Sequence, residues 1–367
     1  MFISINGSDF KAVDPLLHPM STQKFPIVFA LLAIALLVSG CAQQQGTSAN
    51  NSGVPVLTIY TYDSMVSEYG LGPKVIPKFE AQCGCKVNMV AKGDAGQVLS
   101  ALMLEKENPR ADVAIGIDNS MLSAALKADV LAPFTPGNIS LVPENLRFDK
   151  SGHLTAYDYG YFAFVYDSDA LGFDLNGFNS MLDSRLRKKV LIQNPRTSSP
   201  GLGLLLWTVA VYGDPGYKEF WREFAPNVLT VTAGWDESAG LFSAGEAPVY
   251  LSYATSPPYY VLYENRTDYI AGNFAEGHYV QVEGMGIVNG AKNRALAEEF
   301  IAFSLTEPFQ EEIPLNQYMF PINHSVELPD AYKYALKPSV QLELDPALVE
   351  QKQEEWISEW EKIMSSS

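Results

Sequence analysis

Basic residues are scarce in this chain of 367 residues, which has 25 Lys and Arg against 42 Asp and Glu and a formal net charge of −17. This shortage argues against nucleic-acid binding, because clustered Lys and Arg are needed to displace the counterions of a phosphate backbone. An acidic surface suits solubility and a cationic ligand instead. The length and the 47% hydrophobic content are those of a globular protein larger than one typical domain, and they predict two lobes.

Cysteine and histidine are rare as well, and neither forms a metal-binding pattern. Cys83 and Cys85 supply only two of the four ligands that a structural zinc site needs. An oxidising compartment would allow a disulfide around Gly84, and a pair of buried free thiols is the alternative. We expect the pair to be structural rather than catalytic. The four histidines show no metal-ligand spacing: His18, His153, His278 and His324.

Catalytic and nucleotide-binding motifs are also missing. The chain has no G-x-S-x-G, no P-loop, no H-E-x-x-H and no dinucleotide-binding fingerprint. Because the chain lacks a recognisable set of catalytic residues, the sequence favours a receptor over an enzyme.

One apolar run near the start, residues 25–38, resembles the core of a secretory signal and is too short for a comfortable membrane span. The Val-Ser-Gly-Cys sequence that ends at Cys41 resembles the lipobox of bacterial lipoproteins, in which the cysteine becomes the lipidated first residue. We therefore expect a leader over residues 1–41, with Met20 as a candidate true start. An uncleaved anchoring helix is the alternative. Residues 42–53 are small and polar, and they predict a flexible tether.

Three strand patterns follow, at residues 54–60, 86–91 and 111–116, each leading towards an acidic residue: Asp63, Asp94 and Asp118. Helical patterns separate the strands, so the fold class is α/β. Ligands in open α/β sheets bind beyond the carboxyl ends of the strands. Helix N-caps explain Asp at these positions about as well, because the carboxylate accepts from free backbone N–H groups.

Two extended segments, residues 154–167 and 277–289, are predicted to cross between the lobes, and the first is too long for an ordinary strand and could serve as a hinge. The predicted organisation is a first lobe over residues 54–160, a second over 161–275, a return to the first over 276–325 and a C-terminal helical segment over 326–367. Within the second lobe we expect helices at 178–187 and 202–212 and a strand at 190–193. Further helices are expected at 295–304, 308–312 and 346–364, and a loop at 314–321.

The loop at residues 194–206 predicts a helix start, with Ser198 or Ser199 as N-cap and Pro200 in the first turn. Free N–H groups at such a start can hold a phosphate. Residues 230–260 predict a strand, a short helix, a second strand and an aromatic loop. Trp235 and Tyr253 there, near acidic residues, would suit a flat organic cation. The alternative is that these rings only pack in the core.

The chain resembles the thiamine-binding substrate-binding proteins of bacterial ABC importers. Segments such as VLTIYTYDS, DYGYFAFVYD, PRTSSPGLGLLLW, LSYATSP and NFAEGHYVQVE occur in the order found in that family, from residue 54 to the C-terminus. The resemblance implies a type II periplasmic-binding-protein fold with crossover strands as a hinge, and a monomer without a cofactor. It implies a cleft for thiamine, thiamine monophosphate or thiamine diphosphate. It further implies delivery to a permease and its ATPase from an extracytoplasmic position. The lipobox at Cys41 departs from the free periplasmic form of the family and predicts a receptor tethered to the membrane.

The resemblance also implies site residues. Tyr62 would line the cleft, Asp94 would face the ligand and Ser198 would donate to a phosphate. The rings around thiazolium and pyrimidine would be Trp235, Tyr253 and Tyr259. Three positions depart from the family pattern, with Tyr69 and Tyr318 in place of Trp and Ala95 in place of an expected Gly. The smaller rings put affinity and phosphate preference in question, because cation–π attraction is strongest for Trp.

Two other functions fit parts of the sequence. A receptor of the same fold for ferric ion or another small ligand is suggested by the adjacent Tyr259 and Tyr260. An enzyme like thiaminase, which is similar in fold, would need a cysteine nucleophile. Only Cys83 and Cys85 would be available for that role.

Overall fold

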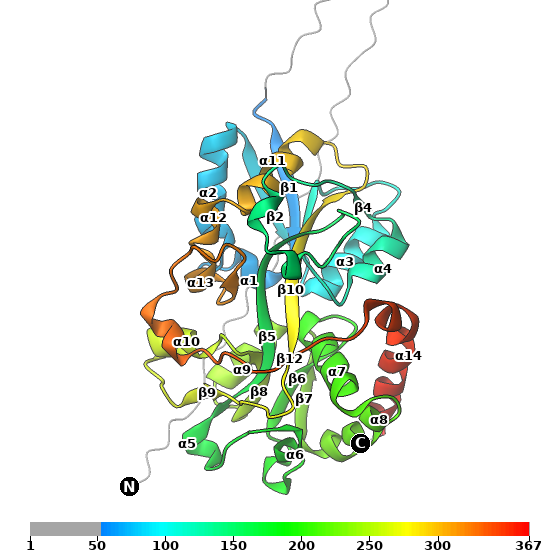
Figure 1. Ribbon diagram of the computed structural model, residues 1–367, viewed down its shortest axis with the longest axis vertical. Helices are drawn as coiled ribbons and strands as arrows, with labels where there is room; N and C mark the ends of the chain where they lie inside the picture. The colour runs from blue at the N-terminus through cyan, green and yellow to red at the C-terminus, as the bar shows by residue number, and fades with distance from the viewer. Residues whose placement is uncertain (1–52, 367) are drawn as a thin grey trace, which may run out of the picture. The chain divides into compact units, whose positions relative to one another are not determined.

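The structure, a computed structural model, describes residues 53–366 (Figure 1). The predicted leader, the lipobox at Cys41 and all but the last residue of the predicted tether lie outside the described residues. The strands are β1 (Val56–Thr61), β2 (Lys86–Ala91), β3 (Val113–Asp118), β4 (Leu131–Ala132), β5 (Thr155–Asp167), β6 (Val190–Gln193), β7 (Val228–Thr232), β8 (Val249–Tyr253), β9 (Tyr269–Ala271), β10 (His278–Val288), β11 (Phe320–Pro321) and β12 (Gln341–Leu342).

The α-helices connect and cover these strands. They are α1 (Asp63–Val66), α2 (Gly72–Cys83), α3 (Ala95–Leu104), α4 (Leu122–Ala128), α5 (Ser168–Leu171), α6 (Phe178–Met181), α7 (Ser199–Tyr212), α8 (Gly216–Phe224), α9 (Trp235–Ser243), α10 (Pro257–Tyr259), α11 (Arg294–Ser304), α12 (Glu307–Gln310), α13 (Ile313–Asn316) and α14 (Pro346–Ser365). Between residues 53 and 366, no helix combines the length and the apolar character that crossing a membrane requires.

Two strands join two α/β halves into one sheet of order β2-β1-β3-β10-β5-β8-β6-β7. β1 is parallel to β2 and β3, and β6 is parallel to β7 and β8. β10 is antiparallel to both β3 and β5, and β5 is antiparallel to β8. Parallel strands alternating with helices on each side are the α/β arrangement that the sequence predicts.

The predicted crossing segments are β5 and β10, which run side by side through the middle of Figure 1. β5 pairs with β10 as far as Tyr161 and with β8 from Phe162 onward, so a single strand belongs to both halves. We call the half built on β1, β2, β3 and β10 the first lobe, and the half built on β6, β7 and β8 the second lobe. The exact domain bounds given from the sequence stay a prediction.

Successive side chains of β1 pack on opposite faces of the first-lobe sheet. Ile59 packs in a cluster with Val75 and Phe79 of α2, whereas its neighbour Tyr60 packs in a different cluster with Val98 of α3. Successive strand side chains point to opposite faces, so helices on both sides are needed to bury them. Cys83 and Cys85, at the end of α2, are joined by a disulfide, which settles the two alternatives left open for this pair.

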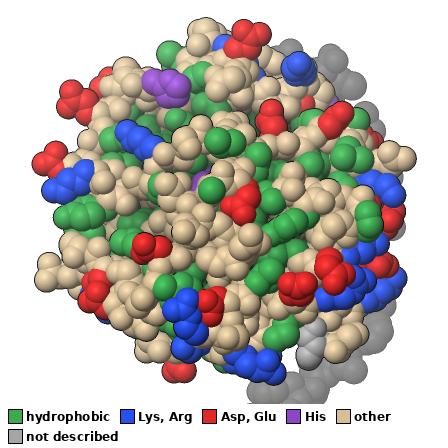
Figure 2. All heavy atoms as spheres, turned by 60° about the horizontal axis from the view of Figure 1, so that its bottom comes forward, with side chains coloured by type: hydrophobic (Ala, Val, Ile, Leu, Met, Phe, Trp, Pro, Cys, Tyr) green, Lys and Arg blue, Asp and Glu red, His purple; other side chains and the backbone are tan. Residues whose placement is uncertain are grey.

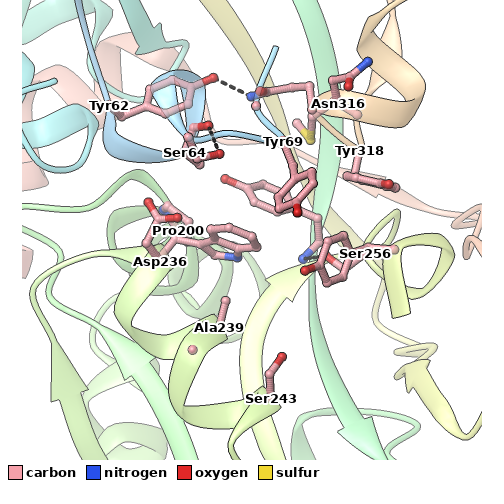
Figure 3. A pocket seen from close by; sticks show the side chains of 18 of the residues that line it. Tyr62, Ser64, Tyr69, Pro200, Asp236, Ala239, Ser243, Ser256, Asn316 and Tyr318 are labelled. Carbon is pink, nitrogen blue, oxygen red and sulfur yellow. Dashed lines mark hydrogen bonds between the residues drawn. The ribbon is translucent and has the colours of Figure 1, made fainter. Parts of the chain in front are cut away.

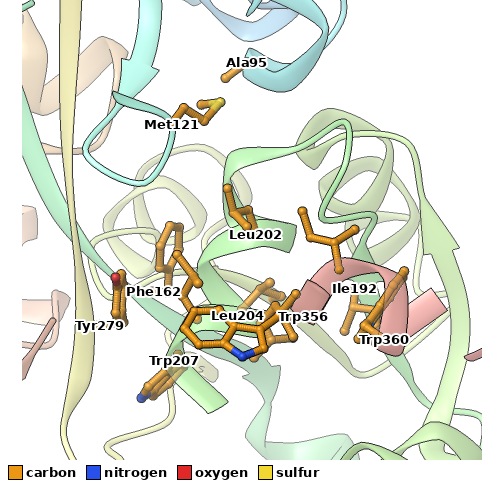
Figure 4. Close-up of a cluster of buried hydrophobic side chains, with 14 of the residues drawn as sticks. Ala95, Met121, Phe162, Ile192, Leu202, Leu204, Trp207, Tyr279, Trp356 and Trp360 are labelled. Atoms are coloured by element: carbon orange, nitrogen blue, oxygen red, sulfur yellow. The ribbon is translucent and has the colours of Figure 1, made fainter. Parts of the chain in front are cut away.

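A cluster of buried hydrophobic side chains extends from the first lobe through the second lobe (Figure 4). It includes Trp207 of α7, whose ring lies 4.7 Å from that of Phe178 and whose indole N–H donates to the backbone oxygen of Gly277 at 2.9 Å. Trp356 and Trp360 of α14, predicted to share one helix face, are both buried in the same cluster. The C-terminal helix is therefore anchored to the second lobe.

Three local predictions were wrong. The helix expected at 178–187 stops at Met181, because the Asn227 amide donates to the backbone oxygens of Met181 and Asp183, which a continuing helix would use for itself. The aromatic segment after Ser256 is helical rather than a loop, with prolines at the first turn of α10 and a π-helical turn after it. The loop expected at 314–321 contains most of α13 and the short β11.

The surface carries charges of both signs. On the face shown in Figure 2, Asp and Glu side chains are interspersed with Lys and Arg, and apolar side chains lie between them. Several of the ion pairs are short-range contacts on helices, such as Arg294 with Glu298 and Lys362 with Glu359. Pairs of this kind contribute little to stability, so the fold rests on its buried clusters.

A matched pair of glycine substitutions tests the packing of α7 on β5. A Cβ on Gly203 would lie 1.9 Å from the ring of the fully buried Phe162, whereas a Cβ on Gly240, inside α9, would meet no atom within 4 Å. We expect Gly203→Ala to lower the free energy of unfolding by roughly 1–3 kcal/mol through overpacking. Gly240→Ala should raise it by up to about 1 kcal/mol, because alanine favours the helix. Equal effects in denaturant titrations would contradict the close approach.

Candidate functional site

A cavity of about 390 Å³ lies where the carboxyl ends of strands from both lobes meet (Figure 3). In Figure 3, Tyr62 and Ser64 of the first lobe face Pro200, Asp236 and Ala239 of the second. Its polar lining residues are Ser64, Ser67, Asp94, Ser199, Asp236, Ser243, Ser256, Glu264, Glu283, Asn316 and Gln317, and its aromatic ones are Tyr62, Tyr69, Trp235, Tyr250, Tyr253, Tyr259, Tyr260, Tyr263 and Tyr318.

Tyr62 stands at the inner end of the cavity, directly after β1. Its hydroxyl lies 2.8 Å from that of Tyr157 and 3.1 Å from a carboxylate oxygen of Glu283, and it also accepts from the amide of Gln317. A side chain on Gly116, which has a φ of 101°, would collide with the Tyr62 ring. The position of this ring is therefore fixed by contacts from three other segments.

Trp235 and Tyr253 are also held in place. Trp235 is the first residue of α9, and its indole N–H donates to the Ser252 hydroxyl of β8 at 2.9 Å. The Tyr253 ring lies 5.4 Å from that of Phe162, which is wholly buried. Rings whose positions are set by hydrogen bonds and packing can bind a flat ligand without first being ordered.

Four tyrosines form a group at the mouth of the cavity, which we call the mouth tyrosines: Tyr69, Tyr259, Tyr263 and Tyr318. Tyr69 and Tyr318 come from the first lobe, and the other two come from α10 and the turn after it. The ring centroid of Tyr263 lies 6.2 Å from that of Tyr69 and 5.3 Å from that of Tyr259. The ring centroids of Tyr259 and Tyr318 are 5.4 Å apart. The backbone of Tyr318 has a left-handed φ of 56°, which is uncommon for a residue with a bulky side chain. Backbone conformations of this kind occur often at functional sites. The group bridges the two lobes.

Asp94 accepts hydrogen bonds at the starts of two helices from different lobes. One carboxylate oxygen accepts from the N–H of Ala95 in α3 at 2.6 Å, and the other accepts from the N–H of Trp235 in α9 at 2.8 Å. Its N-cap role, left open by the sequence, is confirmed by a capping box with Gln97. Burial raises the pKa of Asp94, and these N–H groups, with Ser198 and Ser199 at the start of α7, oppose that rise.

The cavity is acidic. Asp94, Asp236, Glu264 and Glu283 line it, and no lining residue, all of which lie in the described part of the chain, is Lys or Arg. Removal from bulk water raises the pKa of Asp236 to about 6, and the nearby Asp94 and Asp63 add to the rise. Carboxyl groups with so little positive charge around them favour a bound cation.

The structure brings together every residue proposed for the site except Ser198. Tyr62, Tyr69, Asp94, Ala95, Trp235, Tyr253, Tyr259 and Tyr318 all line the cavity. Ser198 is buried just behind the cavity wall, and its hydroxyl has no hydrogen-bond partner of good geometry within residues 53–366. Ser199 lines the cavity instead. The roles of these residues towards a ligand remain predictions.

Sequence reasoning did not single out Glu283, Gln317 or Tyr263 as cavity residues. A usable signal existed for Glu283, because Gln281 and Glu283 alternate with apolar residues in a strand that is buried over its whole length. Polar side chains at such positions need partners or a function. Gln317 and Tyr263 lie close in the sequence to residues predicted for the site, but nothing in the amino-acid sequence distinguishes them from ordinary surface positions.

The residues behind the two other functions do not assemble as those functions require. The disulfide leaves neither Cys83 nor Cys85 as a free thiolate, and the remaining cysteine, Cys41, lies outside the described residues. The rings of Tyr259 and Tyr260 are nearly perpendicular at 88°. The Tyr260 hydroxyl is hydrogen-bonded to that of Tyr250 at 2.6 Å in the core. Two tyrosinates converging on one metal ion would need a different arrangement.

Comparison with known proteins gives consistent matches. A model of bacterial extracellular solute-binding proteins matches residues 108–342. The thiamine-binding periplasmic protein of Salmonella typhimurium is 41% identical over 312 residues, 85% of this chain and 94% of that protein. That of Brucella melitensis is 41% identical over 307 residues, 83% and 90% of the two chains. A solved periplasmic thiamin binding protein has a TM-score of 0.80 at 40% identity, covering 85% and 96%. These matches confirm the periplasmic-binding-protein fold predicted from the sequence.

Proposed function

Since the chain belongs to the family of thiamine-binding periplasmic proteins, within the bacterial extracellular solute-binding proteins, we propose that it captures thiamine in the cavity between its lobes and delivers it to an ABC permease. The named relatives are binding proteins rather than enzymes. An extracytoplasmic location follows from the same family.

The observation that carries the proposal is a cavity with several aromatic walls, four carboxyl groups and no Lys or Arg. Thiamine joins a thiazolium ring, which is a fixed cation, to a flat aminopyrimidine. Ring faces attract such a cation, and the lining carboxyl groups, of which Glu283 is buried, complement its charge. A volume of about 390 Å³ lies in the range of small-molecule sites.

Capture would proceed by closure of the lobes around β5 and β10. Contacts between the lobes already exist beside the cavity, where the Ser199 hydroxyl donates to Asp118 at 2.9 Å and the Trp235 N–H donates to Asp94. The mouth tyrosines add ring contacts across the entrance. A ligand that touches both lobes would favour this closed arrangement over an open one.

For thiamine mono- and diphosphate, we propose that the phosphate binds at the start of α7, where Ser198 and Ser199 present a buried hydroxyl and backbone N–H groups. The Asp94 carboxylate faces the same N–H groups. A phosphate and Asp94 would therefore compete for donors and repel each other. The preference among thiamine forms would depend on this competition.

The proposal extends to a lipid anchor at Cys41, a tether over residues 42–53, and action as a monomer that serves a permease and its ATPase. The lipobox sequence supports the anchor, and the family relationship supports the permease and ATPase as partners.

Binding of thiamine should be detected by calorimetry of the purified protein, stripped of carried-over ligand, as a one-to-one complex without turnover. Trp235→Ala should weaken thiamine binding by about 2 kcal/mol, roughly thirtyfold in Kd, because a ring wall is lost. Trp235→Phe keeps a ring and should weaken it less. Unchanged affinity in Trp235→Ala would show that this ring does not contact the ligand.

Asp94→Asn should raise the affinity for thiamine diphosphate relative to thiamine by several-fold to about tenfold, because it removes a negative charge beside the proposed phosphate position. Asn is also a good N-cap, so the start of α3 should persist. Glu237→Gln, on the exposed side of α9 outside the cavity lining, is the matched control and should leave the ratio unchanged. An equal ratio in Asp94→Asn and the parent would refute the competition.

The anchor is tested by expressing the chain in a bacterium fed a labelled fatty acid. The parent should carry the label and sediment with membranes, whereas Cys41→Ala should carry none. Label retained by Cys41→Ala would place any lipid elsewhere.

A further inference from the structure

Two acidic side chains face each other on the crossing strands. Asp158 of β5 and Glu283 of β10 are direct cross-strand partners, and Asp118 of β3 is the partner of Glu283 on its other side. Asp158 is wholly buried, and Glu283 is 5% exposed and lines the cavity. A row of carboxyl groups therefore crosses the strands that join the lobes, and its middle member touches the ligand space.

The hydrogen-bond donors around this pair are unequally shared. Glu283 accepts from the hydroxyls of Tyr157 at 2.7 Å and Tyr62 at 3.1 Å, and from the amide of Gln317 at 3.3 Å. Neither oxygen of Asp158 accepts a hydrogen bond from a donor in residues 53–366, and the group it faces is the Glu283 carboxyl. Two carboxylates cannot bond to each other, so a proton between them is the simplest way to satisfy both.

No positive charge compensates the pair. The titratable groups that face it come from every neighbouring element: Asp118 of β3, Tyr62 after β1, Tyr157 of β5, Tyr253 of β8 and Tyr332 between β11 and β12. No Lys, Arg or His of the described chain forms an ion pair or hydrogen bond with either acid. Burial raises the pKa of Asp158 well above its usual range, and the Glu283 charge raises it further. Asp118 is better satisfied, since it accepts from Ser199, Gln281 and two backbone N–H groups.

We propose that Asp158 and Glu283 share one proton in the free protein and release it to solvent when a cationic ligand enters the cavity. The pair then passes from one negative charge to two, and the ligand supplies the compensating positive charge. Glu283 is thereby a further ligand-recognition residue, and Asp158 is a positioning residue that acts through it. The inference deepens the proposed function and rests on it, because the expected cation is thiamine.

Charge selectivity follows from this exchange. A ligand with a fixed positive charge is bound with release of the proton, whereas a neutral ligand of the same shape leaves the proton in place. Since binding releases a proton, affinity for the cation rises with pH until the pair is already ionised in the free protein. A neutral analogue should show no such rise.

The test is calorimetry of the purified protein with thiamine at about pH 7.5, in two buffers with different enthalpies of ionisation. This pH lies above the pKa values of about 6 that burial gives Asp118 and Asp236, so these acids contribute little. We expect release of roughly one proton for each thiamine bound. An analogue with a neutral thiophene ring in place of thiazolium should bind more weakly and release none.

Two variants test whether the released proton comes from Asp158 and Glu283. Asp158→Asn preserves the shape and removes one of the two carboxyls, so it should still bind thiamine but release no proton. Glu283→Gln should also abolish the release and weaken thiamine binding. Asp236→Asn, which removes another cavity carboxyl, should retain the release. Proton release that persists in Asp158→Asn, or is lost only in Asp236→Asn, would overturn the proposal.

The unfolding of the free protein gives a second readout. A carboxyl whose pKa is raised by folding binds its proton more tightly in the native state, so it stabilises the fold at low pH and loses that effect as pH rises through its folded pKa. Burial raises the pKa of Glu283 to about 7 and the pKa of Asp158 well above its usual range, so the Tm of the parent should fall as pH rises through neutrality, and that of Asp158→Asn should fall less. Identical profiles would contradict the shared proton even if thiamine did not bind. Failure of thiamine to bind would refute the proposed function separately.

Discussion

The antiparallel pairing of β5 with β10 is the constraint on which the rest of the structure depends. These strands carry the chain between the lobes, and β5 changes partner from β10 to β8 between Tyr161 and Phe162. Both are buried along most of their length, so their polar side chains must be satisfied inside the protein. The cavity opens beside them, because the strands of each lobe direct their carboxyl ends towards this junction. The strands that join the lobes therefore also contribute to the ligand cavity, which Glu283 of β10 lines.

Much of this arrangement could be predicted from local sequence patterns. The crossing strands were visible as alternating segments, the first of them too long for an ordinary strand, and Asp94 was visible as a residue before a helix. Trp235 and Tyr253 were recognisable because rings and acids lie close together in the chain. Features that depend on distant segments could not be seen. α6 ends early because of Asn227, more than forty positions later. The pairing of Asp158 with Glu283 depends on strand register, which no single segment reveals.

For the aromatic part of the site, too, the residues could be predicted from the sequence but their contacts could not. Tyr69 and Tyr318 were identified through their place in the family pattern, but their contact with Tyr259 and Tyr263 depends on how the chain folds between distant segments. Each of these tyrosines supplies a ring face together with a hydroxyl that needs a partner. The Tyr318 hydroxyl is buried without one within residues 53–366. This polar atom lies near Tyr263 of the other lobe, where a ligand or water can satisfy it.

The acids in and beside the cavity are held in two different physical ways. Asp94 accepts hydrogen bonds from backbone N–H groups at the starts of two helices, and these donors cannot be removed by a change of pH. Asp158 has no such donors, so it needs either a proton or a nearby cation. Only the second kind of acid can exchange its compensating charge for a ligand. A site that held all its carboxylates with fixed donors would attract cations without responding to them. The crossing strands place this pair where the lobes meet, so the proposed ionisation of the pair and the proposed closure around a cation would act on the same strands.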